Sequence, residues 1–151
     1  MRVFVDTNIV LDCMADRQPF AADARKLLIL GAINEVELWL CPTQLTDLFY
    51  LLTDGGKSRL AAEAKSRLAT VRKFVHVGLM GEDVIDAALR SPWDDFEDAC
   101  LYQCALQVKP DVIVTRNGKD FERSRIPVLT CAEFFDYLEQ EKGLVYEELL
   151  L

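Results

Sequence analysis

Short apolar runs alternate along this chain with longer segments in which apolar residues recur every three or four positions. A continuous apolar run bounded by polar residues is typical of a strand that a parallel sheet buries on both faces. The longer segments have the period of amphipathic helices. The predicted strands cover residues 3–5, 36–41, 74–77, 112–115 and 127–129, and the predicted helices cover 9–14, 19–31, 42–54, 57–73, 82–91, 94–106 and 132–140. This alternation predicts an α/β fold in which helices cover both faces of a mostly parallel sheet.

The length and the ends of the chain suggest one domain with a short tail. A chain of 151 residues is long enough for a single hydrophobic core. We expect residues 1–140 to form this domain and residues 141–151 to form an apolar C-terminal tail, with leucines at 144 and 149–151. Because an exposed apolar segment usually marks a contact, we expect Tyr146 and the leucines to pack against the domain or a second subunit.

Composition narrows the class of protein. No apolar run approaches the roughly 20 residues that span a bilayer, and the first residues lack a secretory signal pattern, so we expect a cytoplasmic protein with no membrane partner. Five cysteines in mostly apolar surroundings favour reduced, buried thiols over a disulfide framework. The net charge of −8 argues against indiscriminate nucleic-acid binding, although divalent cations can neutralise a local cluster of acids.

Acidic side chains stand where the strands of such a sheet end. Asp6 closes the first strand, Asp47 lies early in the helix after the second, and Asp98 lies near the start of the helix before the fourth. Asn117 and Asp120 follow the fourth strand. Ligands of open α/β sheets bind beyond the carboxyl ends of the strands, so these groups can converge there. Oxygen ligands without a supporting His or Cys set suit Mg²⁺ or Mn²⁺, whose bound water can attack a phosphodiester.

Several simpler interpretations compete with this one. Asp6 is also a suitable helix N-cap, a role that Asn8 alone can fill. His76, the only histidine, lies in an apolar strand, which predicts a partly buried structural residue rather than a general base or zinc ligand. Cys100 and Cys104 are separated by one helical turn and are expected to be small core residues. The chain also lacks both the complete phosphate-binding loop motif and the Gly-x-Gly-x-x-Gly motif, so a nucleotide cofactor is not indicated.

Four segments resemble the PIN-domain nucleases in order and spacing. They are FVDTN at 4–8, TQLTDL at 43–48, DFEDA at 95–99 and IVTRN at 113–117. The resemblance implies a three-layer α/β/α fold with a parallel five-stranded sheet, an acidic pocket for Mg²⁺ or Mn²⁺, and single-stranded RNA as substrate. Many bacterial members are toxins of toxin–antitoxin pairs and often form dimers, so the resemblance also implies an antitoxin partner and a homodimer.

The resemblance assigns the catalytic acids to Asp6, Asp47 and Asp98. Asp47 stands where the family often has Glu, and its shorter side chain would bind a metal through water. Asn117 stands where a fourth acid is common, so it would be a neutral ligand. Asp120 either completes the metal site or caps the turn before residue 121. Asp95 lies one turn before Asp98, where it either extends the metal site or complements the helix dipole.

Basic and polar residues beside this pocket are candidates for RNA contacts. The residues expected to bind nucleic acid are Arg116, Lys119, Thr7, Asn8 and Thr115. The basic helix at 57–73 is a further candidate, although a solvated charged face explains it equally well.

The sequence therefore predicts a metal-dependent ribonuclease, with two alternatives from other classes. A non-catalytic PIN scaffold that binds RNA or a protein is consistent with Asn117 and with the acidic net charge. A phosphatase of the haloacid dehalogenase type would use Asp6 as a nucleophile but needs a second Asp two residues later, and Asn8 occupies that position.

Overall fold

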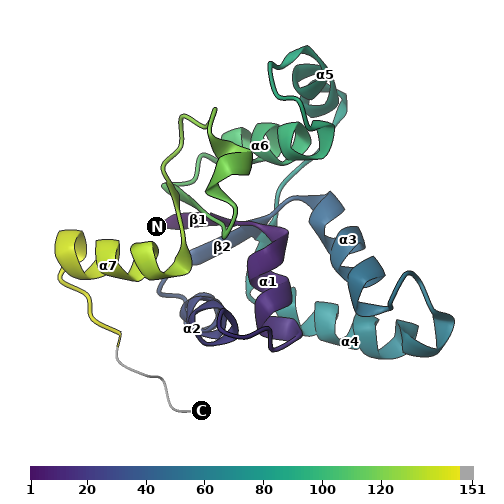
Figure 1. The fold of residues 1–151 in the computed structure, drawn as a ribbon, viewed down its shortest axis with the longest axis horizontal. Helices are drawn as coiled ribbons and strands as arrows, with labels where there is room; N and C mark the ends of the chain where they lie inside the picture. The colour runs from purple at the N-terminus through teal and green to yellow at the C-terminus, as the bar shows by residue number, and fades with distance from the viewer. Residues whose placement is uncertain (147–151) are drawn as a thin grey trace.

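The computed structural model describes residues 1–146 and has a five-stranded, all-parallel sheet at its centre (Figure 1). The strand order is β3-β2-β1-β4-β5, with β1 in the middle. The strands are β1 (Arg2–Val5), β2 (Glu37–Leu40), β3 (Val75–Val77), β4 (Val112–Val114) and β5 (Val128–Leu129). Every neighbouring pair is parallel, so the prediction of a parallel five-stranded α/β fold is confirmed.

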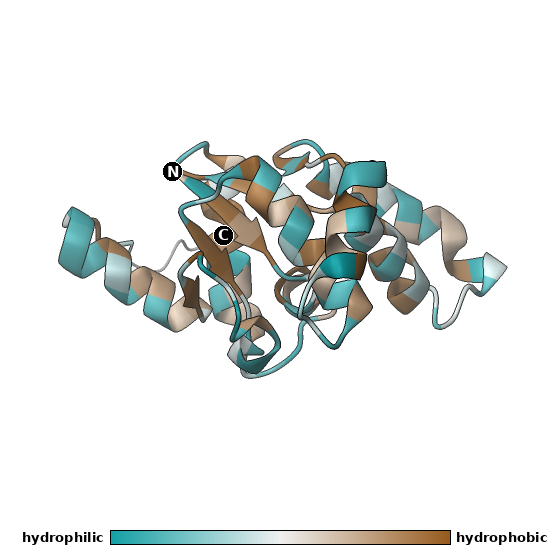
Figure 2. Ribbon diagram, turned by 90° about the horizontal axis from the view of Figure 1, so that it is seen from above, coloured by the Kyte–Doolittle hydropathy of each residue, from teal (hydrophilic) through white to brown (hydrophobic). Residues whose placement is uncertain are grey.

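Helices cover both faces of the sheet and follow the alternation of side chains along β1. Val3 and Val5 face a core built with α1 (Thr7–Met14), α2 (Ala21–Ala32) and α7 (Cys131–Lys142), to which α3 (Pro42–Leu52) and α4 (Ala61–Val71) also contribute. Phe4 faces the opposite core, with α5 (Glu82–Arg90), α6 (Phe96–Val108) and the 3₁₀ turn η2 (Gly118–Phe121). The strands are therefore apolar on both faces and lie between amphipathic helices, as Figure 2 shows.

The strand order places a crevice at the end of β1. Its neighbours on the two sides are β2 and β4: the chain runs outward from β1 to β2 and β3 on one side, then crosses over to β4 and β5 on the other, so the strand order reverses at β1. Val5 pairs with Val114, which makes Asp6 and Thr115 neighbours just beyond the sheet. Such a topological switch point is where open α/β sheets bind ligands. The first strand was predicted to end at this acid, and its three apolar residues are indeed buried.

The basic segment at 57–73 differs from the single helix that its sequence predicts. It consists of the 3₁₀ turn η1 (Ser58–Leu60) followed by α4. Lys57, which precedes the turn, has an extended backbone, and no side chain caps the start of α4. Two of its basic side chains bind backbone carbonyls, Arg67 that of Met14 and Arg72 that of Val75.

The prediction of a partly buried His76 is wrong. Its side chain is exposed because β3 is an edge strand and pairs only with β2. His76 lies opposite Trp39 in the parallel register and stacks on its ring with 4.8 Å between the centroids. The prediction for Cys100 and Cys104 is confirmed, since both are buried in the core.

The C-terminal tail is described only in part. Tyr146 packs against the core on the α7 side, and its hydroxyl donates a hydrogen bond to Glu35 over 3.1 Å. Leu144 and Val145 are exposed. The leucines at 149–151, which were predicted to anchor the tail, lie outside the described residues. Within residues 1–146, the helices are all too short or too polar to traverse a bilayer.

Candidate active site

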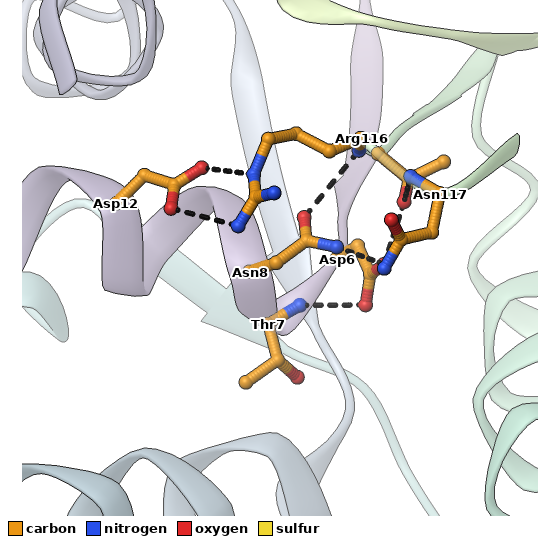
Figure 3. Close-up of polar contacts among 7 residues, drawn as sticks. Asp6, Thr7, Asn8, Asp12, Arg116 and Asn117 are labelled. Atoms are coloured by element: carbon orange, nitrogen blue, oxygen red, sulfur yellow. Dashed lines mark hydrogen bonds and ion pairs between the residues drawn. The ribbon is translucent and has the colours of Figure 1, made fainter. Parts of the chain in front are cut away.

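Asp6 lies at the switch point and is both buried and fully hydrogen-bonded. It is the N-cap of α1, where Thr7 N–H donates to Oδ1 over 2.8 Å. Asn8 Nδ2 and the Thr115 hydroxyl donate to Oδ2 over 3.1 and 2.6 Å (Figure 3). Asp6 is therefore both the N-cap of α1 and an acid at the carboxyl edge of the sheet. Three donors from α1 and the segment after β4 give this carboxylate one orientation.

Burial raises the pKa of Asp6 above its ordinary value. The hydrogen bonds from Thr115 and Thr7 act in the opposite direction because they stabilise the ionised form. The negative charge of Asp120 raises the pKa further, and the positive charge of Arg116 lowers it. Ionised Asp6 is therefore destabilised by burial and by a neighbouring acid, and a cation beside it would relieve both effects.

Gln44 joins three elements beneath this carboxylate and was not identified from the sequence. Its side chain is fully buried near the start of α3. The amide nitrogen donates to the Val5 carbonyl over 2.8 Å and to the Thr7 hydroxyl over 3.2 Å, and the amide oxygen accepts from Cys41 N–H over 2.6 Å. Gln44 therefore ties α3, which carries Asp47, to the strand end that carries Asp6.

The start of α6 contributes a second set of acids. Asp95 is the N-cap, and its side chain accepts a hydrogen bond from Asp98 N–H over 2.9 Å. Burial, together with the negative charges of Asp95, Asp120, Asp6 and Glu97, raises the pKa of Asp98 to about 7. The structure thus brings Asp6, Asp98 and Asp120 into one electrostatic cluster.

Glu97 is a second residue that the sequence analysis missed. Burial raises its pKa, and so do the charge of Asp47 and a hydrogen bond with the Asp47 carboxyl. The charges of Asp95 and Asp6 act in the same direction. Glu97 therefore links Asp47 to the other acids. The sequence signal was the acidic run at 94–98, in which Glu97 directly precedes Asp98.

The segment after β4 faces these acids. Asn117 is exposed at the start of η2, and its backbone N–H donates to the Thr115 hydroxyl over 3.0 Å. Asp120 lies within η2. An open cavity of about 290 Å³ is lined by residues of this segment and of the α6 start, among them Trp93, Asp98, Lys119 and Asp120. Lys119 forms no ion pair within the described part of the chain, so its charge is available to this cavity.

The sequence profile of the PIN domain matches residues 2–119, which is most of the chain. The chain belongs to the PIN domain family. No curated protein sequence is matched by this chain.

Solved structures of other PIN proteins share the fold at low sequence identity. VapBC-1 from nontypeable Haemophilus influenzae is 16% identical with a TM-score of 0.62, and the alignment covers 87% of this chain and 99% of the other. VapC20 from Mycobacterium tuberculosis, a toxin that cleaves the sarcin–ricin loop, is 17% identical with a TM-score of 0.61 over 81% and 95% of the chains. FitAcB from Neisseria gonorrhoeae is 13% identical with a TM-score of 0.63 over 86% and 98%. At these identities the likeness supports the fold alone.

Arg116 of this PIN domain does not extend into the acidic crevice. Its guanidinium donates two hydrogen bonds to Asp12, over 2.5 Å from Nε and 3.0 Å from Nη2. It also lies 4.2 Å from the centroid of the Phe20 ring. Figure 3 shows the side chain leading away from Asp6 toward α1. Its predicted contact with RNA remains a prediction, and the cations that line the neighbouring cavity are Lys119 and Arg123.

The donor set of the crevice suits a hard divalent cation that keeps part of its hydration shell. Within residues 1–146, no three His, Cys, Asp or Glu side chains are placed to hold one ion directly. The available donors are carboxylate, amide and hydroxyl oxygens, and the only histidine lies on the edge strand β3. Mg²⁺ prefers such oxygen ligands and usually retains several waters, which can bridge to acids beyond direct reach. The residues therefore fit Mg²⁺ or Mn²⁺ bound partly through water.

Proposed function

We propose that this PIN domain is a Mg²⁺- or Mn²⁺-dependent endoribonuclease that hydrolyses phosphodiester bonds of single-stranded RNA. The observation that carries the proposal is the mutual electrostatic effect of Asp6, Asp98 and Asp120, whose negative charges raise the pKa values of Asp6 and Asp98. Within residues 1–146, none of these acids has an ion-pair partner. Acids that repel one another at the carboxyl edge of a sheet favour a divalent cation.

Residues on both sides of the crevice would bind the cation. Asp6, fixed by three hydrogen bonds, would hold the cation on the sheet side together with Asn117 and Asp120 of the segment after β4. Asp98 and Asp95 would contribute from the start of α6, and Asp47 would contribute from α3. A bound cation would neutralise the scissile phosphate and lower the pKa of an attacking water. Burial and the neighbouring acids raise the pKa of Asp98 while no cation is bound, and a bound cation would stabilise its ionised form.

RNA contacts would come from the rim of the crevice. The ammonium group of Lys119 lines the cavity and is suited to a phosphate. The Thr7 hydroxyl already accepts a hydrogen bond from Gln44, and the Thr115 hydroxyl already donates to Asp6. The Thr115 hydroxyl and the Asn8 amide therefore orient the Asp6 carboxylate, the Thr7 hydroxyl holds Gln44, and any RNA contact would use their remaining hydrogen-bonding capacity.

A toxin role with an antitoxin partner is the finer form of this proposal. Its support comes from the solved neighbours, which include a toxin–antitoxin complex from Klebsiella pneumoniae, 18% identical with a TM-score of 0.57 over 85% and 97% of the chains. By the same analogy, we propose that the chain forms a homodimer. A non-catalytic PIN scaffold that binds RNA or protein is the second candidate, and its support is Asn117 at the position of the frequent fourth acid.

A cleavage assay on matched variants tests the proposal. Wild type, Asp6→Asn and Asp136→Asn are purified in parallel and incubated with a single-stranded RNA carrying a fluorophore and a quencher, with Mn²⁺ or with EDTA. Asp136 is an exposed acid on α7, outside the crevice, and serves as the control. We expect metal-dependent cleavage by wild type and Asp136→Asn, and a loss of about 10²-fold or more in Asp6→Asn. Equal cleavage by all three would indicate contaminating nuclease, and RNA binding without cleavage would support the scaffold.

A further inference from the structure

An ion pair lies behind the crevice, and within residues 1–146 its two side chains form no hydrogen bond with the acids of the cluster. Asp12 on α1 is fully buried, and both its carboxylate oxygens accept hydrogen bonds from Arg116, over 2.5 and 3.0 Å. The guanidinium lies between this carboxylate and the Phe20 ring, 4.2 Å from the ring centroid. Two parallel hydrogen bonds and an aromatic contact hold the planar guanidinium in one orientation.

This ion pair is one of two ties between the same two segments. Thr115 and Arg116 are consecutive residues after β4. Asp6 is the N-cap of α1, and Asp12 lies within this helix. The Thr115 hydroxyl binds Asp6. The Arg116 side chain binds Asp12, as Figure 3 shows. The two ties come from neighbouring residues and reach α1 at two different positions, so together they restrain the rotation of the segment as well as its distance from α1.

The rotation of this segment determines what faces Asp6. Asn117 N–H donates to the same Thr115 hydroxyl that binds Asp6, and Asp120 follows within η2. Arg116 N–H also lies 3.5 Å from the Asn8 amide oxygen, whose nitrogen binds Asp6. If the Arg116 side chain were released, the segment would keep the bonds of Thr115 to Asp6 and Leu129 and the long Arg116–Asn8 contact, and residues 116–120 would be held less firmly.

The pair is better suited to setting geometry than to adding stability. Replacing a buried ion pair with apolar residues of similar volume is often neutral or stabilising, because both charges lose hydration on burial. Breaking it from one side is costly, since an unpaired buried charge remains. A bidentate pair differs from other ion pairs because its two parallel hydrogen bonds fix the relative orientation of the two side chains.

We propose that Asp12 and Arg116 are positioning residues that orient the segment 115–120 toward Asp6 and thereby set the affinity of the crevice for a divalent cation. Neither side chain touches the cation or the RNA. The inference rests on the proposed function for the identity of that cation. Removing residues behind a metal site typically weakens metal binding by about 10- to 100-fold, which sets the scale of the expected effect.

A double variant separates positioning from folding. Asp12→Leu combined with Arg116→Met removes the pair without leaving a buried charge, and its melting temperature is expected to stay within a few degrees of wild type. Mn²⁺ titrated into the protein is expected to bind about 10-fold more weakly. Arg116→Lys keeps the positive charge but cannot donate two parallel hydrogen bonds. Its Mn²⁺ affinity is therefore expected to lie between those of wild type and the double variant. The control is Arg25→Met, which breaks the exposed Arg25–Asp16 pair and is expected to bind Mn²⁺ like wild type.

Amide hydrogen exchange measured in EDTA provides a second readout that needs no metal. The Asn117 amide, which binds the Thr115 hydroxyl, is expected to exchange several-fold faster in the double variant, while amides of β1 are unchanged. Unchanged exchange at Asn117, in the double variant or in Arg116→Lys should the former fail to fold, would overturn the proposal. So would Mn²⁺ affinity equal to that of wild type.

The two readouts also separate this inference from the proposed function. If wild type binds no Mn²⁺ and cleaves no RNA, the proposed function fails. In that case the exchange of Asn117 still decides whether the ion pair orients the segment, and the role assigned to it in setting metal affinity is overturned.

Discussion

The two sides of the crevice carry acids that are held in opposite ways. On the sheet side, Asp6 is buried and accepts hydrogen bonds from a backbone amide, a side-chain amide and a hydroxyl. On the helix side, Asp98 is only half-buried, and its carboxylate accepts no hydrogen bond within residues 1–146. Its neighbours are other acids, whose charges contribute to raising its pKa to about 7.

The sheet side of the crevice is therefore preorganised by hydrogen bonds, whereas the acids on the helix side repel one another. Neutral donors around Asp6 fix the position of one carboxylate and offset part of the burial cost of its charge. The helix-side acids lack such donors and would be stabilised by a cation or a proton. The hydrogen bonds around Asp6 therefore stabilise the fold, whereas the charges of the helix-side acids destabilise it until a cation or a proton neutralises them. Mutations on the two sides should change stability in opposite directions.

The largest effect on stability is expected on the sheet side, from Thr115→Val. This change removes the hydroxyl that donates to Asp6 and accepts from Asn117 N–H, at a residue that is almost completely buried. A buried carboxylate that loses a donor costs about 1–3 kcal/mol. The melting temperature should fall by roughly 2–4 °C per kcal/mol, as thermal unfolding in EDTA can measure. Thr130→Val provides a comparison at a helix cap outside the crevice.

A smaller effect of opposite sign is expected from Asp98→Asn on the helix side. The amide removes the charge that burial and four neighbouring acids oppose. After allowing for solvent screening at this half-exposed site, we expect a gain of about 1–2 kcal/mol at pH 8 in EDTA. A decrease in melting temperature would contradict the repulsion that the comparison assigns to this side.

The pH dependence of that gain sharpens the comparison. The pKa of Asp98 in the folded protein, about 7, lies above the ordinary aspartate value of 3.8, so the folded protein binds more protons than the unfolded chain between these limits. Stability from this group is therefore complete below about pH 4, falls as pH rises toward 7, and stays low above that. Unfolding in denaturant from pH 4 to 8 should show the gain from Asp98→Asn growing from near zero to its full value. A gain that is independent of pH would show that the charge of Asp98 is not its cause.

The smallest effect concerns RNA binding at the rim. Lys119→Gln should reduce the slope of log affinity against log salt by about 0.7, the value for one phosphate contact with a single strand. The double variant Asp12→Leu with Arg116→Met should leave that slope unchanged, because Arg116 is committed to Asp12. Each change is combined with Asp6→Asn, so that the RNA is not cleaved. Filter binding of RNA at several salt concentrations then measures the salt slope of each variant. An unchanged slope for Lys119→Gln would remove Lys119 from the RNA contacts.

The fold could be predicted from the sequence because its signals are local. Apolar runs mark the strands, and each acid that follows a strand is placed at the carboxyl edge by the parallel topology alone. Asp6 illustrates this, since the end of its strand and its capping position were both visible in the sequence. The error at His76 arose because an edge strand and a central strand have similar apolar patterns when they are short.

The residues that support the site could not be predicted, because their partners are distant in sequence. Asp12 looks like an ordinary polar residue of a short helix until Arg116, 104 positions later, is placed beside it. Gln44 is similar, since its buried amide is satisfied by Val5 and Thr7 across the sheet edge. Only the packing of α1 and α3 on the sheet reveals that these polar groups are buried and paired.

The central claim is that a divalent cation binds between the two sides of the crevice, and calorimetric titration with Mn²⁺ tests it most directly. Wild type and the control Asp136→Asn are predicted to bind Mn²⁺ with equal affinity, and Asp98→Asn is predicted to bind at least about 10-fold more weakly. Thermal unfolding confirms that each variant is folded at the titration temperature. Equal binding by wild type and Asp98→Asn, or no binding by wild type, would contradict the account.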